Sequence, residues 1–248
     1  MHELVGEAMG QAYDLFEGFP HDRLFLQDGL SRAEGNLFAP SGDNPKTALL
    51  RNRERQVSFL VGEVDLEFAV NTSPLLNTTE WGPCVSLPSD DWADELKKQD
   101  DCFYFDGPML TFSSLTEPDE PDIEDVVRLG ERHVEQIKPQ GWESPAEFVR
   151  QSIGFGVAAE DKLLSYAISN FTLSDSMEVA VWTSPDHHRN GLAYRSASAL
   201  LEFCRTENIA PLWTSWSGNT AACGLARKLG FTKEVAHDWA FVKPKKHT

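Results

Sequence analysis

The stretch Glu178-Val-Ala-Val-Trp-Thr-Ser-Pro-Asp-His-His-Arg-Asn-Gly-Leu-Ala193 carries the clearest structural signal in the sequence. Its apolar first part predicts a strand, and Gly191 and Ala193 open a helix after a short polar loop. A helix N-terminus presents unpaired amide hydrogens and the positive end of the helix dipole, which favour a bound phosphate. Gly191 permits close approach of the backbone, and Arg189 can add a planar charged donor. The stretch therefore predicts an anion site, although a tight turn without a ligand would also accommodate this glycine.

Helices and strands alternate on both sides of this stretch. We expect helices over residues 123–137, from the Ser144-Pro-Ala-Glu147 capping box onward, and over 193–204 and 220–229. We expect strands over 154–159, 162–173, 177–183, 211–215 and 239–242. This order predicts a mixed α/β fold for the second half of the chain.

The first half has weaker patterns. Helical spacing of apolar residues predicts a helix within residues 4–16, and another is expected within 90–98. Strand-like runs occupy 57–61, 66–70 and 102–105. No catalytic pattern is present there. The acidic, proline-containing segment 116–125 is typical of a linker, so we predict a smaller α+β domain over 1–118 and a second domain over 119–248.

Composition narrows the function classes. The 248 residues are 41% hydrophobic and 25% charged, as in globular proteins, with a net charge of −17. Such an acidic chain disfavours nucleic acid or an anionic membrane as partner. Apolar runs are too short to span a bilayer, and the N-terminus lacks the basic start of a signal peptide, so we expect a cytoplasmic protein. The four cysteines show no close CxxC spacing, so no metal site is predicted.

A second motif follows the first, Asn219-Thr-Ala-Ala-Cys-Gly-Leu-Ala-Arg-Lys-Leu-Gly-Phe231. Together the two segments resemble the GNAT acetyltransferase superfamily, in order and in separation. The family's pyrophosphate loop, Pro-x-x-Arg/Gln-x-x-Gly-x-Gly/Ala, is matched by Pro185, His188, Gly191 and Ala193. Its downstream motif is matched by Asn219, Ala222, Lys228, Gly230 and Phe231. The resemblance covers residues 123–242 and implies a GNAT-type mixed sheet flanked by helices.

Finer features resemble one branch, the zwittermicin-resistance-type GNAT proteins, which carry a divergent domain before the GNAT domain. The matching segments are Ser144 with Phe148, Gly154-Phe-Gly156, Gly191-Leu-Ala193 and Pro211-Leu-Trp213. The resemblance implies that residues 1–118 form a degenerate GNAT-like half that covers the acceptor side of the site.

The resemblance also implies a binding site for acetyl-coenzyme A as cosubstrate. The residues that it assigns to this site are Val181, Thr183, His188, Arg189, Asn190, Gly191, Leu192, Ala193 and Asn219. The backbone around Val181 and Thr183 would hold the thioester carbonyl. Asn219 would bind the pantetheine arm, and it also fits a helix N-cap. His188 stands where arginine or glutamine is usual, and the adjacent Arg189 could compensate.

Transfer to an amine needs a proton acceptor and a group that protonates the departing thiolate. Glu178 is the candidate general base, and a solvent-facing acid on a half-buried strand is the alternative interpretation. Ala226 stands where many family members have the tyrosine that acts as general acid, so Tyr194 and Ser217 are the remaining candidates.

The sequence thus predicts an N-acetyltransferase that transfers an acetyl group directly to a primary amine within a ternary complex. Either a small molecule or a peptide could supply the amine, and another acyl donor is an open alternative. The rival hypothesis is a non-catalytic GNAT-like module that binds coenzyme A or regulates a partner, which Ala226 and His188 favour. No pattern in the sequence indicates an oligomeric state.

Overall fold

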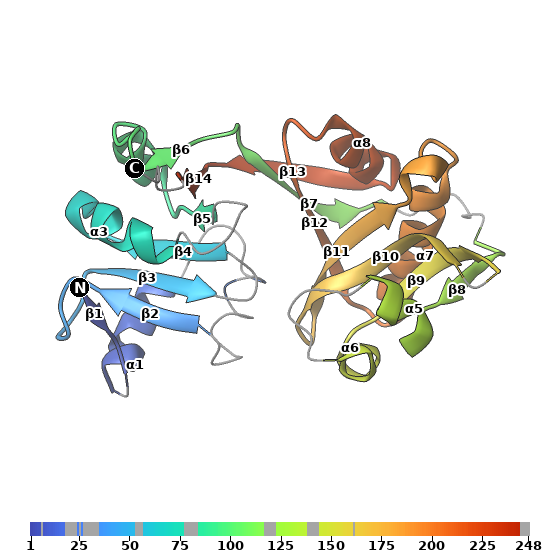
Figure 1. Ribbon diagram of the computed structural model, residues 1–248, viewed down its shortest axis with the longest axis horizontal. Coiled ribbons are helices and arrows are strands. Elements are labelled where there is room, and N and C mark those ends of the chain that lie inside the picture. Colours follow the sequence, from blue (N-terminus) through green and yellow to red (C-terminus); the bar gives the residue numbers. More distant parts are fainter. Residues whose placement is uncertain are drawn as a thin grey trace, which may run out of the picture. The chain divides into compact units, whose positions relative to one another are not determined.

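The computed structural model describes residues 1–5, 7–17, 24, 26, 35–52, 57–76, 84–116, 123–137, 144–160 and 162–243. The chain divides into two compact units: Met1–Met109 with Ala236–Thr248, and Leu110–Val235. Among the described residues, the strands form two seven-stranded mixed sheets flanked by helices (Figure 1). The predicted mixed α/β fold is confirmed.

The first sheet has the strand order β1-β2-β3-β4-β5-β14-β6. Its strands are β1 (His2–Glu3), β2 (Gly35–Ala39), β3 (Thr47–Asn52), β4 (Val57–Gly62), β5 (Cys84–Ser86), β6 (Phe103–Tyr104) and β14 (Trp239–Val242). The helices of this unit are α1 (Glu7–Tyr13), the 3-10 helix η1 (Asp14–Phe16), α3 (Leu66–Leu76) and α4 (Asp90–Leu96). Pairing is antiparallel from β1 to β4 and parallel between β4 and β5.

The predicted strand over residues 66–70 is wrong, because this segment opens helix α3. The Asp65 carboxylate accepts a hydrogen bond from the Phe68 amide (2.9 Å), which caps the first turn of the helix. Phe68, Ala69 and Thr72 are buried, a helical spacing that a five-residue apolar run cannot reveal.

Strand β14 was predicted to close the second domain, and the structure places it in the first sheet. Trp239 and Phe241 pair antiparallel with β5, and Phe241 also pairs with Tyr104 of β6. Figure 1 shows this strand, red by its place near the C-terminus, beside the first-unit strands. The local sequence does not indicate that β14 pairs with β5 and β6. The pairing of strands so far apart in the chain depends on how well their apolar faces fit together.

The start of the second unit also differs from the sequence-based boundary between residues 118 and 119. The strand β7 (Met109–Leu115) belongs to the second sheet, so the chain enters this unit before the predicted linker. Residues 117–122 of that linker lie outside the described residues.

The second sheet has the strand order β13-β7-β12-β11-β10-β9-β8. Besides β7, its strands are β8 (Val126–Arg128), β9 (Gly154–Ala159), β10 (Lys162–Thr172), β11 (Ser176–Thr183), β12 (Ala210–Trp216) and β13 (Phe231–His237). The helices are α5 (Glu131–Ile137), α6 (Pro145–Gln151), the 3-10 helix η2 (Pro185–His187), α7 (Leu192–Thr206) and α8 (Thr220–Lys228). The single helix predicted over 123–137 is therefore wrong: a short strand precedes Gly130, and the helix begins at Glu131.

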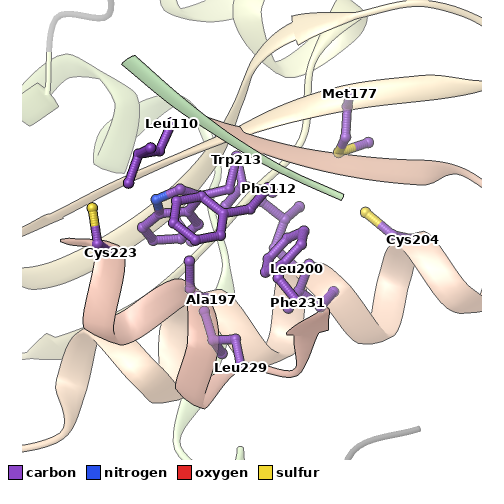
Figure 2. Close-up of a cluster of buried hydrophobic side chains, with 14 of the residues drawn as sticks. Leu110, Phe112, Met177, Ala197, Leu200, Cys204, Trp213, Cys223, Leu229 and Phe231 are labelled. Carbon is purple, nitrogen blue, oxygen red and sulfur yellow. The ribbon is translucent and has the colours of Figure 1, made fainter. Parts of the chain in front are cut away.

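The two faces of this sheet have separate cores. Met177 and Val179 of β11 pack with Leu200 of α7 and Trp213 of β12, and Figure 2 shows the Trp213 and Phe112 rings in this cluster. Alternate residues of the same strand point the other way, so Ala180 packs toward the cluster that includes residues of α5 and α6. Strand β11 therefore carries one face toward α7 and α8 and the other toward α5 and α6.

Replacing Gly62 with alanine is expected to lower the free energy of unfolding by about 2–4 kcal/mol. Gly62 has φ +82°, and a Cβ there would lie 2.0 Å from the Lys46 carbonyl oxygen. That oxygen already accepts the Glu63 amide (2.9 Å), so the turn cannot open without losing this bond. Urea denaturation measures the effect. Gly42→Ala is the control, since no atom lies within 4 Å of its Cβ position; equal midpoints for the two variants would contradict the argument.

Candidate functional site

The N-terminus of helix α7 is open to a ligand. Strand β11 ends at Thr183, and η2 (Pro185–His187) leads to Gly191, the N-cap, which has φ +78° and no side-chain cap bond. The Arg195 amide donates to the Gly191 carbonyl oxygen (3.1 Å), so the four amides before Arg195 have no partner within the helix. This end of α7 therefore presents backbone donors and the positive dipole end.

A cavity of about 810 Å³ adjoins these amides. Of the sequence-predicted residues, it is lined by Val181, Thr183, His188, Arg189, Gly191, Leu192, Ala193, Tyr194 and Asn219. Asn190, Glu178 and Ser217 are not among its lining residues. Its charged lining residues are Arg189 and Lys228, and no described lining residue is acidic, although the chain carries a net charge of −17. The cavity therefore suits an anionic ligand.

Strands β11 and β12 separate beside this cavity. Their parallel register joins Ser176, Met177 and Glu178 to residues 210–212 and ends there. The following part of β11 keeps its antiparallel register with β10, as in the pairs of Val181 with Ala167 and of Thr183 with Ser165. Beyond Glu178, the edge of β11 that faced β12 is no longer paired with that strand. At Val181 and Thr183 this edge faces the cavity, where its backbone groups can bind an extended ligand.

Two loop residues are held by short-range bonds. His188 Nε2 lies 3.0 Å from the Thr183 carbonyl oxygen, which closes the loop between β11 and α7. Asn219 Oδ1 accepts the Ala222 amide (3.1 Å) and caps helix α8. The cap uses only the side-chain oxygen, so the amide nitrogen of Asn219 can still donate into the cavity that the residue lines.

Glu178 is the last residue of β11 that pairs with β12, and it is buried, with 5% of its surface exposed. The interpretation as a solvent-facing acid is therefore wrong. Asn170 Nδ2 donates to Glu178 Oε2 (2.9 Å), and the Thr214 hydroxyl donates to Oε1. Asn170 is the extra residue of a β-bulge between Ser169 and Phe171, and this bulge directs its side chain to the carboxylate.

Residues 118–239 match the family described as GNAT acetyltransferase. Over these residues the chain is similar to that family. No protein of curated function matches the sequence.

Several solved structures share the fold of the whole chain. The GCN5-related N-acetyltransferase-like protein from Streptococcus suis 89/1591 is 18% identical, with a TM-score of 0.73, over 96% of this chain and 99% of that one. An acetyltransferase from the GNAT family of Colwellia psychrerythraea is 15% identical, with a TM-score of 0.60, over 96% and 97%. A tandem GNAT protein from the clavulanic acid biosynthesis pathway is 14% identical, with a TM-score of 0.55, over 97% and 96%. At these identities the likeness concerns the fold.

The two hydroxyl groups predicted as candidate general acids differ in position. Tyr194 lines the cavity, and Lys228 Nζ lies 4.6 Å from the centroid of its ring. Ser217 lies in the turn after β12, outside the lining residues. Ala226 is fully buried in the core, so that position of helix α8 supplies no group to the site. Of the two candidates, Tyr194 is the hydroxyl that the fold brings to the cavity.

The cavity is also lined by residues that the sequence did not assign to the coenzyme site, among them Trp182, His187, Trp213 and Lys228. Lys228 was available as part of the second motif, but only the orientation of α8 brings its charge to the same cavity as Arg189. Trp182 has an exposed fraction of 44%, and its ring stacks on Tyr166.

No group of three or more His, Cys, Asp or Glu side chains in the described residues could hold a metal ion. None of the helices in the described part of the chain has the length and apolarity needed to cross a bilayer.

Proposed function

We propose that this protein is an N-acetyltransferase that transfers the acetyl group of acetyl-coenzyme A directly to a primary amine. The observation that carries the proposal is the cavity itself, which joins the open N-terminus of α7, two basic side chains and the free edge of β11. The match of residues 118–239 to the GNAT acetyltransferase family supports acetyl transfer as the reaction.

In this proposal the coenzyme A pyrophosphate lies on the amides at the start of α7. Arg189 lines the cavity beside Gly191 and can pair with phosphate oxygens through its planar fork. Lys228 supplies a second positive charge. The pantetheine arm follows the edge of β11, with the Asn219 amide as donor. The two basic side chains make this cavity locally positive in an acidic protein, which favours an anionic ligand at short range.

The chemistry then needs one proton acceptor and one proton donor. The neutral amine attacks the thioester carbonyl, the C–S bond breaks, and the amide product and coenzyme A thiolate form. Backbone amides near Val181 and Thr183 would stabilise the oxyanion. Glu178 would take the amine proton through a water molecule, since its carboxylate is buried, and Tyr194 would protonate the thiolate.

Direct transfer is favoured over an acyl-cysteine intermediate. Among the described residues of the second unit, the cysteines are Cys204 and Cys223, and both are buried and outside the lining of the cavity. Burial raises the pKa of the Cys204 thiol to about 12, so this thiol stays protonated near neutral pH. Because the thiolate is the nucleophilic form, Cys204 does not suit a covalent step, and Cys223 is excluded by its burial away from the cavity lining.

The first unit fits the proposal as a degenerate GNAT-like half without a coenzyme site. Its β4–α3–β5 unit has the same parallel pairing as β11–α7–β12. In the first unit, however, the Asp65 carboxylate occupies the helix N-terminus, and the adjacent cavity is lined by the three acids Glu63, Asp65 and Glu95 against one basic residue, Lys46. These charges would repel a pyrophosphate, so we expect one coenzyme per chain. Placement in the zwittermicin-resistance-type branch is part of this proposal and depends on the sequence motifs.

A non-catalytic coenzyme A-binding module is the second candidate. The observation that favours it is Glu178, which is buried, lies outside the cavity lining, and has both carboxylate oxygens hydrogen-bonded within the protein. In that case Glu178 would hold β10, β11 and β12 together where the strands separate.

Titration calorimetry with acetyl-coenzyme A tests the proposed site. We expect micromolar affinity, a stoichiometry of one, retained binding of desulfo-coenzyme A and none of ATP at the same concentration. Release of coenzyme A in the presence of pooled amines then separates the enzyme from the non-catalytic module. A folded sample that binds no coenzyme A would contradict both candidates.

A further inference from the structure

Strand β11 carries a second set of side chains on the face opposite to helix α7. Between Glu178 and Trp182, each residue of β11 pairs with a residue of β10, because the extra residue of the bulge belongs to β10. Glu178, Ala180 and Trp182 therefore share one face, the face on which Ala180 packs toward α5 and α6. This face combines a carboxylate, a small residue and a large aromatic ring in sequence.

Trp182 is held as a rigid and exposed ring. Its indole stacks on Tyr166, with ring centroids 5.5 Å apart and an angle of 23° between the planes. Its carbonyl oxygen accepts the Ser165 hydroxyl (3.0 Å), and Ser165 Oγ also lies 2.8 Å from the Thr183 hydroxyl oxygen. Burial raises the pKa of Tyr166, so the ring beneath the indole stays uncharged.

The Trp182 ring combines exposure with a place beside the cavity. Trp182 is 44% exposed even though Tyr166 stacks on it, and it also lines the cavity proposed for acetyl-coenzyme A. A fixed indole in such a place can stack a planar group of a ligand at little cost in conformational entropy.

We propose that Tyr166 and Trp182 form an aromatic platform for the acceptor, and that the acceptor is a primary amine joined to an aromatic ring by a short chain. This rests on the proposed function, because it assigns the amine to the same site. Alternate residues of a strand are about 7 Å apart. A ring stacked on Trp182 would therefore place an amine two or three carbons away over Ala180, between the platform and Glu178. Ala180 is only partly buried, and its side chain is a single methyl group.

The first test measures binding without any reaction. Indole N–H resonances of ¹⁵N-labelled protein are recorded with phenethylamine, 2-cyclohexylethylamine and spermidine, and Trp182→Phe identifies the Trp182 resonance by its disappearance. We expect the resonance to shift with phenethylamine at concentrations at least tenfold lower than with the other two amines. Equal shifts with the non-planar amine or with spermidine would overturn the planar-ligand assignment.

The second test separates binding from catalysis. In Trp182→Ala we expect the KM for phenethylamine to rise about tenfold or more while kcat changes less than threefold, with Trp182→Phe in between. The KM for 2-cyclohexylethylamine should change little. The matched control is Tyr104→Ala, which removes an exposed ring stacked on Phe241 in the first unit. Unchanged phenethylamine kinetics in Trp182→Ala would overturn the platform while leaving the acetyltransferase intact. A shifted Trp182 resonance without transfer to any amine would refute the proposed function and support the platform.

Discussion

Replacing Gly191 with glutamate is expected to weaken acetyl-coenzyme A binding at least about 100-fold, because a carboxylate would then stand among the amides that receive the pyrophosphate. No atom lies within 4 Å of the Cβ position, so the side chain can be added without a clash in the protein. The positive φ of +78° costs a non-glycine residue about 1–2 kcal/mol, which the fold should tolerate. The loss therefore concerns the ligand and not the fold.

Gly191→Asn is the matched control for this variant. Asparagine tolerates the left-handed conformation and is a favoured N-cap, so affinity should stay within about fivefold of the wild type. Calorimetry measures both affinities, and thermal melts monitored by circular dichroism verify that both variants are folded. If the folded glutamate variant bound acetyl-coenzyme A like the wild type, the pyrophosphate would not lie at the start of α7.

Replacing Glu178 with glutamine is expected to lower kcat/KM by about 10²–10⁴-fold, the usual contribution of a general base. The affinity for acetyl-coenzyme A should change less than about twofold, since Glu178 does not line the cavity. Glutamine has the same shape but only one acceptor oxygen. That oxygen can accept from Asn170, and the glutamine amide nitrogen can donate to the Thr214 hydroxyl. Two charge-assisted bonds then become neutral ones, with an expected decrease of about 1–3 kcal/mol in the free energy of unfolding.

Steady-state kinetics and calorimetry on the same preparation measure these effects. Asp175→Asn is the control, because Asp175 is an exposed acid in the turn just before β11 and should leave the kinetics unchanged. Wild-type turnover in Glu178→Gln, combined with reduced stability, would assign Glu178 a structural role between the strands. It would also move the proton acceptor to another group or to solvent.

The two units show what a local pattern can and cannot predict. The helix over 193–204 was predicted from its apolar spacing, and the structure buries Ala197, Leu200, Leu201 and Cys204 of α7. The N-cap at Ser144 was also predicted from the sequence, and the Ser144 hydroxyl oxygen accepts a hydrogen bond from the Glu147 amide (3.1 Å). The strand predicted over 66–70 was wrong because a short apolar run fits a strand and a buried helix turn equally well.

The sequence by itself determined the strand, loop and helix around Gly191 and the cap at Asn219, because each depends on contacts within a few residues. It also determined the spacing of the two motifs, which assigned some of the cavity residues, including Gly191 and Asn219. Only the tertiary structure decided that β14 completes the first sheet, that Glu178 is buried between Asn170 and Thr214, and that Lys228 and Trp182 line the same cavity. These features depend on the register of strands distant in sequence and on the packing direction of helices. A linear pattern specifies neither of them, because each depends on the combined shape of faces that come together only on folding.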